Sequence, residues 1–87
     1  MNYQDYDKKT GHVIKLIRTD KKITQRALAK SMQIDPSKLS HVEAGEKSLT
    51  VGQFLVLAGK LNMEATDILK RIIADDKESA SPAESQS

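Results

Sequence analysis

Four segments of the chain share one pattern: an apolar residue, a capping residue, three further residues and a second apolar residue. The segments are Ile23–Leu28, Ile34–Leu39, Leu49–Phe54 and Met63–Ile68. This spacing is typical of a hydrophobic staple, in which the apolar residue before a helix packs on the fourth helical residue. The second residue of the first three segments is Thr or Asp, whose side-chain oxygen accepts a free backbone N–H at a helix start. The pattern therefore predicts four short helices.

Further signals mark where these helices begin and end. Pro36 suits the first helical position, and Gln53 completes a capping box with Thr50. Gly45 and Asn62 stand where a left-handed residue would end a helix. With an earlier apolar stripe that includes Val13 and Ile17, these signals predict five helices. We place them at residues 10–20, 24–31, 36–44, 51–61 and 65–74. No segment alternates like a half-buried strand, so the expected fold class is all-α.

The fourth expected helix carries the most regular apolar spacing. Apolar side chains recur there at helical i, i+3, i+4 and i+7 spacing, which is continued at i+10, and they are Val51, Phe54, Leu55, Ala58 and Leu61. Such a stripe predicts the buried face of a helix.

The two ends of the chain lack this periodicity. Residues 75–87 are rich in Ser, Glu and Ala, and they predict a disordered tail. Residues 1–9 are predicted to form an N-terminal arm, although Tyr3 and Tyr6 offer side chains that could dock on the domain. One domain is therefore expected over residues 10–74.

Several classes of protein are excluded by what the sequence lacks. The chain has no Cys, which rules out disulfides and thiolate metal sites. It has no Gly-rich phosphate loop and no cluster with metal-ligand spacing, so we predict no catalytic residue, no metal and no cofactor. No apolar run approaches the roughly 18 residues of a membrane span. The polar, acidic start is not a signal peptide, so we expect a cytoplasmic protein without a membrane partner.

The charge is unevenly distributed along the chain. Residues 8–47 hold ten basic and four acidic side chains, a net charge of +6, whereas the whole chain has a net charge of +2. A basic segment between acidic flanks favours a polyanionic partner. From charge alone, a solvated, charge-rich surface is an equally good interpretation.

The second and third expected helices are short, and only Met32–Asp35 joins them. Such a pair crosses steeply, as in a helix-turn-helix. In that motif the second helix enters the major groove of DNA and uses its N-terminal residues to contact bases.

The run from Thr24 to Leu69 resembles the Xre/lambda-repressor-like (Cro/C1-type) helix-turn-helix family. The residues that carry this resemblance are Thr24–Ala29, Ile34–Gly45, Leu55, Ala58, Leu61 and Leu69. The resemblance implies a five-helix lambda-repressor-like DNA-binding domain, with the helix-turn-helix at the second and third helices. Its implied partner is double-stranded DNA.

The resemblance also implies roles for individual residues. Matching positions in the family contact bases, and here they are Pro36, Ser37, Lys38 and His41. Others contact phosphates, and here they are Gln25, Arg26, Lys47 and Ser48. Arg18 and Glu43 match a structural ion pair between the first helix and the recognition helix.

Three positions depart from the family pattern. Gln33 stands in the turn where relatives often have Gly, and it carries about 1–2 kcal/mol of strain if the turn requires a positive φ. Ala44 and Glu46 stand where relatives often carry Lys or Arg. These two departures predict a weaker grip on phosphates.

The expected function is sequence-specific transcriptional regulation, as a repressor on a pseudo-palindromic operator. One small domain contacts few base pairs, so we expect a homodimer. The fifth helix holds more apolar residues than one core-facing stripe needs, and the predicted dimer surface is Ile68, Leu69, Ile72 and Ile73. The alternative is that all four fill the monomer core. The alternative function is an antitoxin of a toxin–antitoxin-type system, whose tail folds on a protein partner.

Overall fold

The computed structural model describes the backbone of residues 2–80 and the side chains of residues 2–74. Five helices make up the fold: α1 (Tyr3–Asp20), α2 (Gln25–Met32), α3 (Pro36–Glu43), α4 (Val51–Lys60) and α5 (Ala65–Ala80). No strand occurs in residues 2–80, so the expected all-α fold class is confirmed. Within the same residues, no helix combines the length and apolarity that a membrane span requires.

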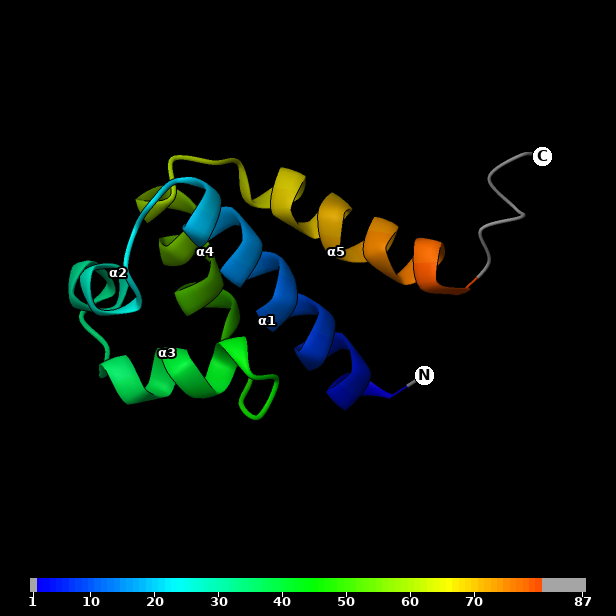
Figure 1. Cartoon of the computed structure of the whole chain (residues 1–87), viewed down its shortest axis with the longest axis horizontal. Helices are drawn as coiled ribbons and strands as arrows, with labels where there is room; N and C mark the ends of the chain where they lie inside the picture. Colours follow the sequence, from blue (N-terminus) through cyan, green and yellow to red (C-terminus); the bar gives the residue numbers. More distant parts are fainter. Residues whose placement is uncertain (1, 81–87) are drawn as a thin grey trace.

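The long helix α1 organises the domain. It contacts both α3 and α5, while α2 contacts α3 and α4 (Figure 1). The core between the helices is apolar, and all five contribute to it: Val13, Ile14, Ile17, Leu28, Ala29, Met32, Leu39, Val42, Leu57, Ala58, Leu61, Ile68 and Ile72. Burial of each large side chain in such a core stabilises the fold by about 1.5–3 kcal/mol.

The predicted caps at Thr24, Asp35 and Thr50 are confirmed. Thr24 Oγ1 accepts from the backbone N–H of Ala27 at 3.0 Å, and Thr50 forms a reciprocal capping box with Gln53. Left-handed residues follow α3 and α4 at the predicted positions, with φ of 80° at Gly45 and 58° at Asn62. The turn after α2 also requires a positive φ, of 61° at Gln33. Lys22 also has a positive φ, of 61°, which the sequence analysis did not anticipate.

The first helix begins at Tyr3 rather than at residue 10, so residues 3–9 form its first turns and not an irregular arm. A capping box holds this end, because Asn2 Oδ1 accepts from the backbone N–H of Asp5 and Asp5 Oδ2 accepts from that of Asn2, both at 3.1 Å. The spacing Asn2-x-x-Asp5 was the available signal.

The fifth helix extends to Ala80 rather than ending at residue 74. The sequence between these points contains Lys77, Glu78 and Ala80, which favour helix, and its next proline is Pro82. The predicted tail, residues 75–87, therefore overlaps α5. Its last part, residues 81–87, lies outside the described residues. The expected contact of this tail with a protein partner also falls on residues that are not described.

The buried face of α4 differs from the predicted one. Val51 is 77% exposed and Leu55 is 55% exposed, whereas Leu57 is fully buried. The core-facing residues are Phe54, Leu57, Ala58 and Leu61, which follow the same helical spacing. Because residues 51–59 carry no charge, their periodicity fits two faces, and packing against the other helices selected one of them.

Candidate nucleic-acid interface

A tight turn sets the angle between α2 and α3. The left-handed Gln33 ends α2, and the backbone N–H of Ile34 donates back to the carbonyl of Ala29 at 3.0 Å. Asp35 then caps α3, and Pro36 occupies its first turn. The two helices consequently cross steeply: α2 appears nearly end-on in Figure 1, while α3 runs along the lower edge of the domain.

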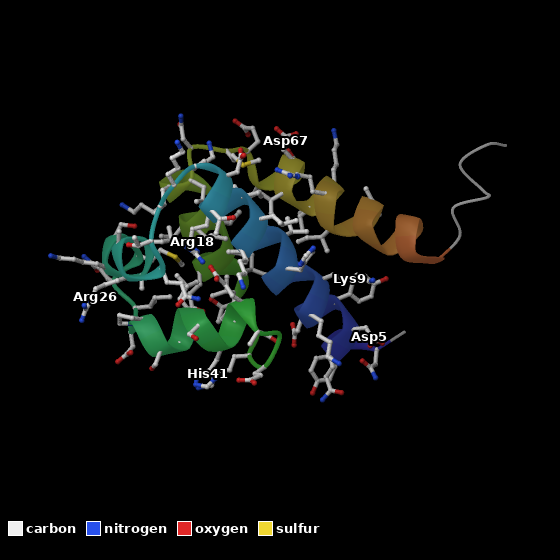
Figure 2. The ribbon with its side chains drawn as sticks, viewed as in Figure 1. Asp5, Lys9, Arg18, Arg26, His41 and Asp67 are labelled. Atoms are coloured by element: carbon white, nitrogen blue, oxygen red, sulfur yellow. The ribbon has the colours of Figure 1, made fainter. Side chains whose placement is uncertain are left out.

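The helix α3 has one buried and one exposed face. Leu39 and Val42 are almost completely buried and fix the helix on the core. The residues assigned to base contact lie on the other side, where Pro36, Ser37 and His41 are exposed and Lys38 is partly buried. Figure 2 shows His41 projecting from the lower edge of the domain, away from the other helices. Ser40 is also exposed on α3, although it was not among the predicted contacts.

The hydroxyl of Ser37 is already engaged. Asp35 Oδ1 accepts from the backbone N–H of Ser37 and from its Oγ, both at 2.8 Å. These two hydrogen bonds, the backbone one foremost, lower the pKa of Asp35 below its ordinary 3.8. The carboxylate is thus ionised at neutral pH. Ser37 keeps its lone pairs and remains an acceptor toward a partner outside the helix.

His41 also has a partner within the protein. Its Nδ1 lies 2.6 Å from Oε1 of Glu46, which follows α3 in the loop to α4. Both side chains are largely exposed, 49% for His41 and 63% for Glu46. In the sequence Glu46 stands out only as a missing cation, and no local pattern predicts this contact.

A buried polar network joins α1, α2 and α3. Arg18 donates to Glu43 through Nε at 2.6 Å and through Nη2 at 3.0 Å, and its Nη1 donates to the carbonyl of Ile23 at 2.7 Å. Gln25 Nε2 donates to Glu43 Oε1 at 2.9 Å. Gln25, which the sequence assigned to phosphate contact, is therefore held in place by the predicted ion pair of Arg18 and Glu43. One of the two amide hydrogens of Gln25 remains for a second acceptor.

The remaining predicted phosphate contacts lie before and after α3 along the chain. Arg26 is exposed at the start of α2 and extends away from the domain (Figure 2). Lys47 and Ser48 are exposed in the loop after α3. Ser48 Oγ donates to Asp7 Oδ2 at 2.6 Å, which ties this loop to the first turns of α1. The sequence did not predict this contact, because Asp7 lay in the expected arm.

Two glycines allow α1 to approach α3 and the loop. A Cβ on Gly11 would lie 2.3 Å from the carbonyl oxygen of Val42 and 2.6 Å from that of Glu43. A Cβ on Gly45 would lie 2.9 Å from Cα of Lys8. The start of α1 thus supports the C-terminal end of α3 directly.

The predicted dimer surface divides into two parts. Ile68 and Ile72 are buried in the monomer core, so their assignment to a subunit interface is wrong. Leu69 is 45% exposed and Ile73 is 53% exposed. The physical reason is helical geometry, since two adjacent stripes of α5 are apolar and only one of them faces α1 and α4.

Acidic and histidine side chains do not gather into a metal site in the described part of the chain, where no group of three or more could hold an ion.

Comparison with known proteins gives a family match and similar structures. A family model described as Helix-turn-helix matches residues 14–68, more than half of the chain. No curated protein matches the sequence. The structure is similar to the clp gene regulator ClgR from Corynebacterium glutamicum, with a TM-score of 0.84 and 23% identity over 91% of this chain and 84% of that one. At this identity the likeness shows the fold alone.

Two restriction-modification controller proteins are also similar. C.AhdI from Aeromonas hydrophila has a TM-score of 0.69 and 29% identity, covering 71% of this chain and 94% of that one. Wild-type C.Esp1396I has a TM-score of 0.72 and 26% identity, covering 79% and 88%. ClgR is a gene regulator, and C.AhdI and C.Esp1396I are controller proteins of restriction-modification.

Proposed function

The chain belongs to the helix-turn-helix family of Xre/lambda-repressor-like DNA-binding proteins, and from this premise we propose that it reads a specific operator with α3 and acts as a repressor. The observation that carries the proposal is the two-sided character of α3. Leu39 and Val42 anchor one side in the core, while Ser37 and His41 project from the other. A recognition helix fixed in this way can present hydrogen-bonding groups to base edges in the major groove.

Phosphate contacts would orient α3 in the groove. Gln25 has a free amide hydrogen at the start of α2, where the helix dipole favours an anion. Arg26 and Lys47 are exposed cations on either side of α3. Ser48 would contact a phosphate only after its hydrogen bond to Asp7 opens.

Dimerisation is the second part of the proposal. One copy of α3 spans few base pairs, so useful specificity calls for a second copy on a half-site about 10 bp away. Exposed apolar residues on α4 and α5 offer the contact surface: Val51, Leu55, Val56, Leu69 and Ile73. Residues 51–59 of α4 carry no charge, so apposing this part of the helix in two copies brings no like charges together.

Sedimentation of single variants tests the dimer. Leu55→Asp and Leu69→Asp should shift the protein from dimer to monomer at tens of micromolar, because each buries a charge at an apolar contact. Leu16→Asp, on an exposed site of α1, is the matched control and should leave the mass unchanged. A wild-type monomer at these concentrations would contradict a stable free dimer.

Selection of sites from random duplex DNA tests the main proposal. The wild type should enrich a pseudo-palindrome. On that site Ser37→Ala and His41→Ala should relax base preference, whereas Gln25→Ala should weaken binding to all sequences alike. Lys60→Ala, an exposed change at the end of α4, serves as the control. Equal losses on every DNA for all three site variants would remove the assignment of base reading to α3.

A further inference from the structure

Glu46 stands next to the proposed base-reading residue His41 and holds one of its ring nitrogens. We propose that Glu46 fixes the tautomer of His41, so that Nε2 of His41 accepts a hydrogen bond from the exocyclic amino group of an adenine or a cytosine. This inference rests on the proposed function, because it assigns a specificity-determining role within the same DNA-reading surface. Glu46 is a positioning residue in it, and His41 touches the base.

The contact between the two side chains determines where the ring proton lies. Nδ1 of His41 is 2.6 Å from Oε1 of Glu46, a hydrogen-bond distance. An ionised carboxylate can only accept, so the hydrogen of this bond belongs to Nδ1. In a neutral imidazole the other nitrogen, Nε2, then carries a lone pair and no hydrogen.

The backbone holds Glu46 in this position. Gly45 adopts a φ of 80°, which turns the chain back at the end of α3. The backbone N–H of Glu46 then donates to the carbonyl of His41 at 2.8 Å, so the same two residues are joined through main chain and side chain. The ring of His41 is therefore oriented before any DNA arrives, and Figure 2 shows that it points outward from α3.

The free nitrogen matches one class of base edge. In the major groove the amino groups of adenine and cytosine donate, whereas guanine O6 and N7 and thymine O4 only accept. A lone pair on Nε2 is attracted by the first class and repelled by the second. A hydrogen bond from Nδ1 to a carboxylate also makes Nε2 a stronger acceptor, as it does for metal-bound histidines.

The charge of Glu46 has a cost for DNA binding. A negative side chain at position 46 weakens attraction to the DNA backbone. Under the proposal, Glu46 lowers the affinity for DNA of any sequence and increases the discrimination between bases at one base pair.

Nuclear magnetic resonance tests the tautomer without DNA. Long-range 1H–15N spectra of the neutral imidazole should show the hydrogen of His41 on Nδ1 in the wild type. In Glu46→Ala it should move to Nε2, the nitrogen that carries the hydrogen in an unconstrained histidine. Glu64→Ala, with the same loss of charge in the loop between α4 and α5, should leave His41 unchanged, and His12 provides an internal reference. A wild-type hydrogen on Nε2, or no change in Glu46→Ala, would overturn the proposal.

Base analogues test the contact itself on the site that the wild type selects. Replacing one adenine by purine, or one cytosine by pyrimidinone, deletes a single amino group. At the contacted position this should weaken wild-type binding about fivefold to tenfold and should not weaken His41→Ala further. Glu46→Ala should lose the same discrimination without losing affinity for random DNA.

The outcomes separate the inference from the function on which it rests. The wild type could select a site on which His41 contacts guanine O6, thymine O4 or no base at all. That result would overturn the inference alone. Failure of the wild type to select any sequence would overturn the proposed function as well as the base contact, while the tautomer spectra would still report on Glu46.

Discussion

Gln25 on α2 donates a hydrogen bond from Nε2 to Oε1 of Glu43 on α3, at 2.9 Å. The same oxygen accepts from Nη2 of Arg18 on α1, at 3.0 Å. One buried carboxylate therefore joins three helices and also orients a side chain that faces the proposed DNA backbone. The carboxylate that stabilises the packing of the helices therefore also holds Gln25, the proposed phosphate contact.

Removal of either charged partner of the buried pair should destabilise the domain strongly. The side chains of Arg18 and Glu43 are only 10% and 2% exposed, so Glu43→Gln leaves a poorly compensated guanidinium and Arg18→Met leaves a poorly compensated carboxylate. We expect each change to lower the free energy of unfolding by up to about 3–5 kcal/mol, measured by urea denaturation. Lys15→Met, on an exposed position of α1, is the control. Near-native midpoints for both variants would contradict this assignment.

Relief of backbone strain in the turn between α2 and α3 should stabilise the protein. Gln33 has a φ of 61°, where a side chain costs about 1–2 kcal/mol and glycine costs far less. Gln33→Gly should therefore raise the thermal midpoint. Ser31→Gly, at an exposed position within α2, should lower it, because glycine costs about 0.5–1 kcal/mol inside a helix. A lower midpoint for Gln33→Gly would show that the side chain makes a contact worth more than the strain.

Gly11 in α1 and Gly59 in α4 should respond in opposite directions to alanine. A Cβ on Gly11 would meet the carbonyl oxygens of Val42 and Glu43 at 2.3 and 2.6 Å, and the backbone cannot yield as a flexible side chain would. Gly11→Ala should cost at least about 1–3 kcal/mol. Gly59→Ala meets no atom within 4 Å and should stabilise α4 by about 0.5–1 kcal/mol. Calorimetry on the two variants measures both effects, and equal shifts would contradict close approach of α1 to α3.

The free energy of unfolding at acid pH should depend on Asp35. Hydrogen bonds from the backbone N–H and then the hydroxyl of Ser37 lower its pKa in the folded state. A lowered folded pKa stabilises the protein above the unfolded value of 3.8, and this contribution is lost as the pH falls through the lower folded value. The midpoint difference between wild type and Asp35→Asn should therefore be constant above about pH 5 and shrink below 3.8. A difference that grows on acidification would contradict the direction of the shift.

Much of the local structure was determined by the sequence itself. Caps at Thr24, Asp35 and Thr50 and left-handed ends at Gly45 and Asn62 depend on residue types that lie at, or within a few residues of, the backbone that they stabilise. Short helices with defined ends leave few ways to arrange the pair α2 and α3. The helix-turn-helix could accordingly be predicted, and so could the outward face of α3.

Only the tertiary structure decided which of two similar apolar faces of a helix is buried. Apolar residues surround much of α4, so packing alone selected Leu57 for the core and left Val51 and Leu55 exposed. On α5 it buried Ile68 and left Leu69 exposed. Contacts between distant residues, such as Ser48 with Asp7, are invisible to local pattern because they exist only once α1 crosses the end of α3. Periodicity fixes how far apart side chains lie along a helix, while burial against neighbouring helices decides which side chains water reaches.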